Sequence, residues 1–205
     1  MTIYPKISNS VSKLGVGIGT INLPAIKTCR ADAPCKKGCY ANKGNFMYSN
    51  VKSSQQKNLD AFLKDPGEFF NVLHYQLEMI PYKYIRWFSS GDIVDARFLE
   101  GMFWLARKHK GTQFLCFTKK YELVNEYLNS HKKPKNLILV FSNWGEWICD
   151  NPHNLPTAWV EFGTESDKLI PENATKCHGK CYECINTLEH CWQLKYGEAV
   201  YFHKH

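Results

Sequence analysis

The sequence lacks any long apolar segment. No hydrophobic run approaches the ~18 residues that a membrane-spanning helix needs, and Met1 to Lys6 contain no hydrophobic stretch of the kind that a secretion signal carries. We therefore expect a soluble, cytoplasmic protein with no membrane partner.

Several familiar motifs are also missing. Gly15, Gly17 and Gly19 alternate with other residues, but they do not form G-x-G-x-x-G and no helix is predicted to follow them, which argues against a dinucleotide-binding turn. No run of Lys and Arg, internal repeat or low-complexity segment is present. A chain of 205 residues with 44% hydrophobic residues is suited to one domain with a buried core.

Cysteine, by contrast, is abundant and grouped. Cys29, Cys35 and Cys39 have the spacing C-x5-C-x3-C, and a second group near the other end has the spacing C-x3-C-x2-C-x6-C. An odd total of nine in a reducing compartment favours metal or cluster ligands over disulfides. The second group supplies enough thiols for a closed metal site, and its members are Cys177, Cys181, Cys184 and Cys191.

The net charge of +7 is unevenly distributed. Residues 1–60 hold nine Lys and Arg against two acidic residues, whereas the remaining chain holds seventeen of each sign. A solvated basic face is one interpretation. The other is that the basic excess around the first cysteine group accommodates an anionic cluster, an anionic substrate or nucleic acid.

Hydrophobic periodicity predicts strands that alternate with helices. Strands are expected over 84–88, 112–117, 137–141, 158–162 and 197–202, and helices over 49–64, 66–80, 96–110 and 122–128. This alternation is typical of βαβ units and a mainly parallel sheet. We predict an α/β fold, a partial (β/α) barrel over residues 1–170 with a short cysteine-rich C-terminal segment, residues 171–205, packed on it.

Polar residues follow the predicted strands, at the edge where parallel α/β proteins bind ligands. For Asp92, the N-cap of the following helix is an equally good interpretation. The polar residues in question are Ser89, Ser90, Gly91 and Asp92 after one strand, Thr118 and Lys119 after the next, and Ser142 and Asn143 after the third.

Three thiols in one loop leave a ligand missing. Structural zinc takes four protein ligands, and no histidine precedes His74. A zinc site completed from afar by Cys116, Cys149 or His74 is one alternative. An iron–sulfur cluster held by three cysteines is a second, and it leaves one iron open to a non-protein ligand. Unrelated free thiols are the third.

These residues resemble the radical S-adenosylmethionine (radical SAM) superfamily. Cys39-Tyr40-Ala41 is similar to the phage-encoded and spore-lyase-like branches, and the segment from Trp87 to Asp92 stands where that family often has a Gly-Gly-Glu type turn. The spacing here, C-x5-C-x3-C, is wider than the family's usual C-x3-C-x2-C.

The resemblance implies a [4Fe-4S] cluster on Cys29, Cys35 and Cys39, with S-adenosylmethionine (SAM) on the open iron. One-electron reduction, from a donor such as flavodoxin or ferredoxin, would then start radical chemistry on a substrate that the sequence does not identify. It also implies that residues 89–92 hold the SAM amino group, and that the polar residues after the next two strands, Thr118, Ser142 and Asn143, line the SAM or substrate pocket.

The resemblance further implies a second [4Fe-4S] cluster on the C-terminal group, where zinc remains an alternative. Two other interpretations of the whole chain stay open. One is an iron–sulfur redox or scaffold protein without SAM chemistry, and the other is a zinc-binding module that contacts nucleic acid.

Overall fold

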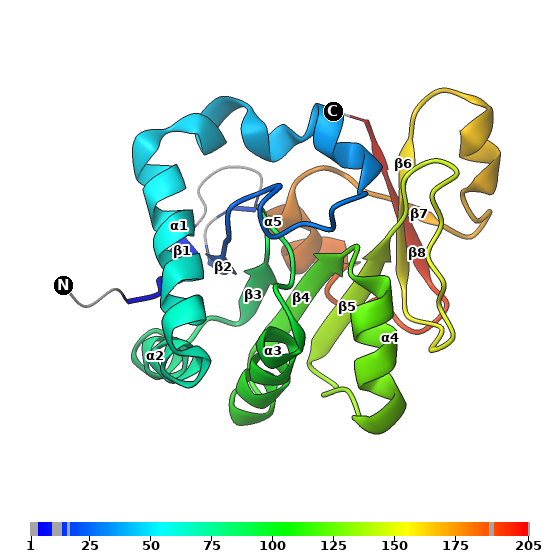
Figure 1. Ribbon diagram of the computed structural model, residues 1–205. Helices are drawn as coiled ribbons and strands as arrows, with labels where there is room; N and C mark the ends of the chain where they lie inside the picture. Colours follow the sequence, from blue (N-terminus) through cyan, green and yellow to red (C-terminus); the bar gives the residue numbers. More distant parts are fainter. Residues whose placement is uncertain (1–3, 10–13, 16, 189–190, 205) are drawn as a thin grey trace.

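The fold is built around one eight-stranded sheet. A computed structural model of the chain describes residues 4–9, 14–15, 17–188 and 191–204. The strands lie in the order β1-β2-β3-β4-β5-β6-β8-β7 (Figure 1). All neighbouring strands are parallel except β1, which pairs antiparallel with β2. The bounds are β1 Ser8–Asn9, β2 Ile18–Ile21, β3 Tyr84–Trp87, β4 Gln113–Thr118, β5 Leu137–Ser142, β6 Thr157–Glu161, β7 Thr175–Lys176 and β8 Ala199–His203.

Helices connect most of the central strands, as the periodicity predicts. Pro66 opens α2 at its first turn, and the Asp65 side chain caps it by accepting a hydrogen bond from the backbone N–H of Glu68. In Figure 1, α3 and α4 lie on the near side of the sheet, and the short α5 lies behind it. The bounds are α1 Ser49–Lys64, α2 Pro66–Met79, α3 Ala96–Lys108, α4 Tyr121–Ser130 and α5 Cys181–Glu183. The predicted α/β class with a mainly parallel sheet is thus confirmed.

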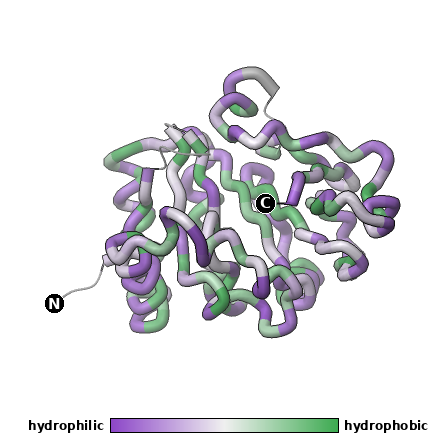
Figure 2. Tube along the Cα trace, turned by 90° about the horizontal axis from the view of Figure 1, so that it is seen from above, coloured by the Kyte–Doolittle hydropathy of each residue, from purple (hydrophilic) through white to green (hydrophobic). Residues whose placement is uncertain are grey.

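Each face of the sheet buries its own apolar cluster. Along β5, Leu137, Leu139 and Phe141 belong to the cluster that the helices cover, whereas Ile138 and Val140 belong to the cluster on the other face. Successive side chains of a strand point to opposite faces, so a continuous apolar run means that both faces are covered. Figure 2 agrees, with hydrophobic segments running through the middle of the molecule.

The edges of the sheet were not anticipated from the sequence. The two-residue strands β1 and β7 are too short to produce a periodic pattern. The N-terminal segment is attached to α2 by the Gln76 side chain, whose Oε1 accepts from the N–H of Ile7 at 3.0 Å and whose Nε2 donates to the Pro5 carbonyl at 2.7 Å. β7 and β8, which come from residues 171–205, join the same sheet as the preceding strands.

No helix in the described ranges combines the length and the apolar character needed to cross a membrane.

Helices α2 and α3 approach closely at Gly101. A Cβ atom at this position would lie 2.0 Å from the ring of Phe70, which is buried. We expect Gly101→Ala to destabilise the protein by about 2 kcal/mol in urea denaturation, because overpacking costs up to about 3 kcal/mol and the helix propensity of alanine returns about 1. Gly111→Ala is the control, since nothing lies within 4 Å of its added Cβ. Equal stability of the two variants would contradict this packing.

Candidate functional site

The loop of Cys29, Cys35 and Cys39 lies over the carboxyl end of the sheet. After β2 the chain crosses above the arrowheads of the central strands before it enters α1 (Figure 1). This crossing consists of short 3₁₀ turns rather than a long helix, with Pro34 opening the first of them. The turns are Pro34–Gly38, Tyr40–Asn42 and Gly44–Met47.

Cys35 and Cys39 lie close enough to Cys29 to affect the pKa of its thiol. Burial, then the carboxylate of Asp92, then Cys39 and Cys35 raise the pKa of Cys29 to about 11. Burial also raises the pKa of Cys35, and the ammonium of Lys119 opposes that rise. Metal or cluster binding must therefore displace protons from these thiols. The loop thus brings together three thiols, a cation and a carboxylate.

The thiols of each group are gathered without closing around a point. Within the ranges that the structure describes, no three Cys, His, Asp or Glu side chains are arranged as ligands of a single metal ion. A single zinc ion draws its sulfur ligands into a tight tetrahedron. A four-iron cluster is also held by cysteine thiolates, so the donor chemistry of these residues suits either kind of group.

The segment Ser89 to Asp92 anchors the first cysteine loop. Ser90 Oγ donates to the Leu23 carbonyl at 2.9 Å, and the N–H of Asp92 donates to Thr28 Oγ1 at 3.0 Å. Gly91 has φ +86°, and a Cβ there would lie 2.7 Å from Thr28 Oγ1, so only glycine fits. This turn therefore fixes the residue that immediately precedes Cys29.

The carboxylate of Asp92 is buried and ties β3 to β4. Thr118 Oγ1 donates to it at 2.6 Å, the N–H of Lys119 at 2.9 Å and the N–H of Ile93 at 2.8 Å. Burial raises the pKa of Asp92, and these three donors oppose the rise. The alternative that Asp92 caps the next helix is wrong, because the side chain of Asp95 accepts from Phe98 N–H and caps α3.

Lys119, which contacts this carboxylate through its backbone N–H, also reaches the end of β5. Lys119 Nζ donates to Ser142 Oγ at 2.6 Å. Asn143 accepts the N–H of Cys149 at 2.8 Å through Oδ1, whereas its Nδ2 is buried with no hydrogen-bond partner in the described chain. Asn143 therefore keeps a free donor, whereas Asp92 is largely saturated.

Ser89 also contacts the cysteine loop. Its carbonyl accepts the hydroxyl of Tyr40 at 2.9 Å, and its Oγ lies 3.4 Å from Thr20 Oγ1. Tyr40 follows Cys39 directly. The segment after β3 therefore contacts the residues next to the first and the third cysteine of the loop.

The second cysteine group packs on the other face of the sheet. Cys191 belongs to the apolar cluster of that face, and Cys177 and Cys181 pack against it. Burial, followed by Cys177, Cys181 and Cys184, raises the pKa of Cys191. The four thiols therefore lie near one another, with Cys177 directly after β7, Cys181 opening α5 and Cys184 directly after α5.

Arg86 on β3 lies between the two cysteine groups. Its positive charge opposes the rise in pKa of Tyr40, beside the first group, and of Cys191 in the second. Its guanidinium stacks on the Phe117 ring, with Cζ 4.3 Å from the centroid, and its Nε is buried without a partner among the described residues. The sequence analysis missed this residue, although a lone charge inside an apolar strand is the signal that identifies it.

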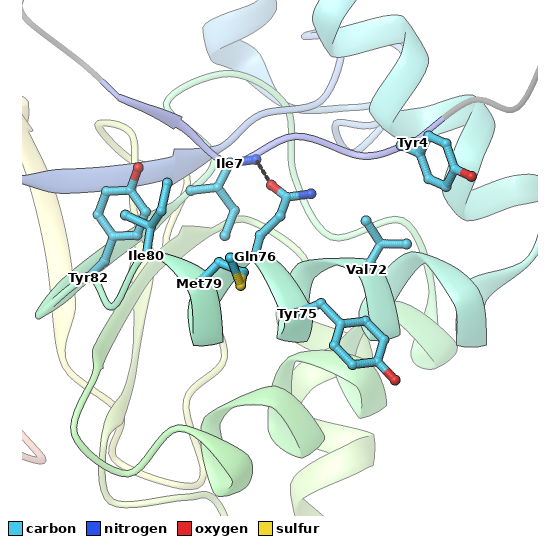
Figure 3. A pocket seen from close by; sticks show the side chains of 8 residues that line it. All are labelled: Tyr4, Ile7, Val72, Tyr75, Gln76, Met79, Ile80 and Tyr82. Atoms are coloured by element: carbon cyan, nitrogen blue, oxygen red, sulfur yellow. Dashed lines mark hydrogen bonds between the residues drawn. The ribbon is translucent and has the colours of Figure 1, made fainter.

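One hollow lies away from all of these groups. It has a volume of about 290 Å³ and lies between the N-terminal segment and α2, lined by apolar and aromatic side chains such as Ile7, Val72 and Met79 (Figure 3). Gln76 uses its Oε1 on the backbone of Ile7 there. Since no charged side chain lines it, this hollow has no means to hold a metal or an anion.

Arg30, next to Cys29, fastens the loop to α4. Its Nε lies 2.7 Å from Asp32 Oδ1 and its Nη1 2.7 Å from Glu122 Oε1. The guanidinium also faces the rings of Trp147 and Tyr121, with Cζ 5.3 and 5.8 Å from their centroids. One side chain thus links the cysteine loop, α4 and the segment after β5.

We expect Arg30→Ala to destabilise the protein by about 1 kcal/mol, because exposed ion pairs and cation–π contacts each contribute less than about 1 kcal/mol. It should also speed protease cleavage between residues 30 and 48, measured by mass spectrometry of the fragments. Arg30→Lys should have a stability and a cleavage rate between those of the parent and of Arg30→Ala, since lysine keeps the charge and loses the planar guanidinium. Unchanged cleavage in Arg30→Ala would contradict this role.

Comparison with known proteins identifies the family. The sequence profile of GP88, described as gene product 88, matches residues 5–176. Since this is most of the chain, the protein belongs to the GP88 family. No curated protein and no solved structure matches it.

Proposed function

We propose that this member of the GP88 family is an iron–sulfur enzyme of radical SAM type. The observation that carries the proposal is the gathering of Cys29, Cys35 and Cys39 at the carboxyl edge of a parallel sheet, beside Lys119, with no fourth cysteine in the loop. Three thiolates leave one iron of a cubane open for a cofactor or substrate.

The strand order supports the proposal. From β2 to β6 the strands follow one another in sequence order, and β8 comes next. This is the order of a (β/α) barrel laid open, with ligands bound at the carboxyl ends of the strands. We infer a partial barrel, since β1 and β7 stand at the two edges of the sheet.

The first cluster would be a [4Fe-4S] centre on Cys29, Cys35 and Cys39. When reduced by one electron, such a centre supplies the reductive cleavage of SAM that starts radical chemistry. Lys119 places a positive charge beside the thiolates, and Asp92 positions Lys119 and the loop. Asn143 Nδ2 and the adjacent Ser142 would orient SAM at the same edge.

The second group, on Cys177, Cys181, Cys184 and Cys191, would hold a fully ligated [4Fe-4S] cluster that stabilises the fold or relays electrons. Zinc remains the alternative there. Arg86, between the groups, is suited to an anionic substrate, because its Nε has no partner in the described chain. A cytoplasmic protein with a flavodoxin or ferredoxin as donor completes the proposal.

Spectroscopy of the reduced protein tests this function. After anaerobic reduction, we expect an electron paramagnetic resonance (EPR) signal of a four-iron cluster that changes when SAM is added. The SAM response should disappear in Cys39→Ala and persist in Cys181→Ala. A cluster signal that ignores SAM would instead support the redox or scaffold alternative.

A further inference from the structure

A second hollow lies at the other end of the strands from the Cys29–Cys39 loop. It has a volume of about 660 Å³, within the range of small-molecule sites. It opens at the amino ends of β3, β4 and β5 and extends to the segment Trp192 to Tyr196. That segment directly follows Cys191, so an occupant would touch the part of the chain that carries the second cysteine group.

The charge of this hollow has a single sign. No aspartate or glutamate lines it, and none of the lysines forms an ion pair in the described part of the chain. The nearby Glu198 accepts the backbone N–H of Lys195 rather than its ammonium. The basic side chains are Lys83, Lys132, Lys133, Lys135 and Lys195. They come from three separate stretches of sequence, and composition did not single them out because residues 61–205 hold as many acidic as basic residues.

Lys133 is the most enclosed of these cations. Its Nζ donates to the carbonyls of Leu137 at 2.6 Å and Pro134 at 3.3 Å, and it lies 5.6 Å from the ring centroid of Tyr196. Burial lowers its pKa to about 8. A half-buried ammonium without a counter-ion is costly, and an anion in the hollow removes that cost.

Aromatic rings form the remaining wall. Trp192 is 2% exposed, and its indole Nε1 is buried with no hydrogen-bond partner among the described residues. Tyr84 meets it edge-on, with ring centroids 5.1 Å apart. Tyr196 is 58% exposed at the mouth. The hollow thus has one exposed ring, that of Tyr196, next to the lysines, and the largely buried Trp192 and Tyr84 complete its aromatic lining.

We propose that this hollow binds a small ligand that carries a polyphosphate and a flat ring, the chemistry of a nucleoside triphosphate. The lysines bind the phosphate oxygens, and the exposed ring of Tyr196 contacts the base. Because its residues are distinct from those of the proposed cluster sites, binding does not depend on the proposed radical SAM activity.

Calorimetric titration of the purified full chain tests the proposal, with tripolyphosphate, ATP and adenosine as probes. We expect ATP to bind, tripolyphosphate to bind more weakly, and adenosine not to bind. Lys132→Ala/Lys135→Ala and Lys133→Met should each raise the Kd for ATP about tenfold or more, as the loss of charge-assisted hydrogen bonds predicts. Their melting temperatures should change little.

Lys52→Ala/Lys57→Ala is the matched control, because it removes the same charge as the double variant from the exposed surface of α1. Its Kd should stay within about twofold of the parent. An equal loss in this control would overturn the proposal, since it would indicate general electrostatic attraction. The proposal would also be overturned if a thymidine oligonucleotide bound and ATP did not. It would likewise be overturned if adenosine bound as tightly as ATP.

Discussion

Cys35→Ala is expected to lose about half of the iron and sulfide of the anaerobically purified protein, and all SAM-dependent change in its EPR spectrum. Cys35 lies in the middle of the first cysteine loop, and its thiol interacts with Cys39 and Lys119. The C-terminal thiols belong to a separate cluster of side chains on the other face of the sheet. Removal of one ligand should therefore leave the second centre in place.

The control for this variant is Cys149→Ala. Cys149 is half-buried and belongs to neither group. It should retain the full iron and sulfide content. Loss of all iron in Cys35→Ala would contradict the independence of the two sites, and full retention would show that Cys35 is not a ligand.

Asp92→Ala is expected to have the largest effect on stability. The substitution leaves Thr118 Oγ1 and the N–H groups of Lys119 and Ile93 without their buried acceptor. Each unsatisfied donor costs about 1–3 kcal/mol, so allowing for relaxation we expect a total loss of about 3–5 kcal/mol. Urea denaturation of the apoprotein measures it.

Asp95→Ala is a matched comparison from the same connection between β3 and α3. Its carboxylate caps α3 at a more exposed position, so we expect a loss of about 1 kcal/mol. The loss of stability in Asp92→Asn should fall between the losses in Asp92→Ala and Asp95→Ala. An amide keeps one acceptor oxygen but turns an N–H donor toward the Lys119 N–H. Equal losses in Asp92→Ala and Asp95→Ala would contradict the role of Asp92.

Local rules account for most of the fold. The first three long helices follow from apolar spacing and from clear stop signals, such as Asp65-Pro66-Gly67. They are Ser49–Lys64, Pro66–Met79 and Ala96–Lys108. The central strands also match, because buried parallel strands are short apolar runs. The strand order and the coverage of both faces required the structure, since pairing between distant segments leaves no local pattern.

The candidate site also has features that the sequence predicts and features that only the structure shows. The cysteine groups are visible as spacings, and the carboxyl-end position of Ser89, Asp92, Thr118 and Ser142 follows from parallel topology. The sequence does not show that the carboxylate of Asp92 accepts hydrogen bonds from the Thr118 hydroxyl and from two backbone N–H groups. It also does not show the lysine-lined hollow, because those five side chains meet only in the folded chain.

Iron, sulfide and zinc analysis of the anaerobically purified protein tests the central claim most directly. We predict brown protein with about eight iron and eight sulfide per chain, as two four-iron clusters require. Colourless protein with stoichiometric zinc and no sulfide would contradict the proposed iron–sulfur centre on Cys29, Cys35 and Cys39.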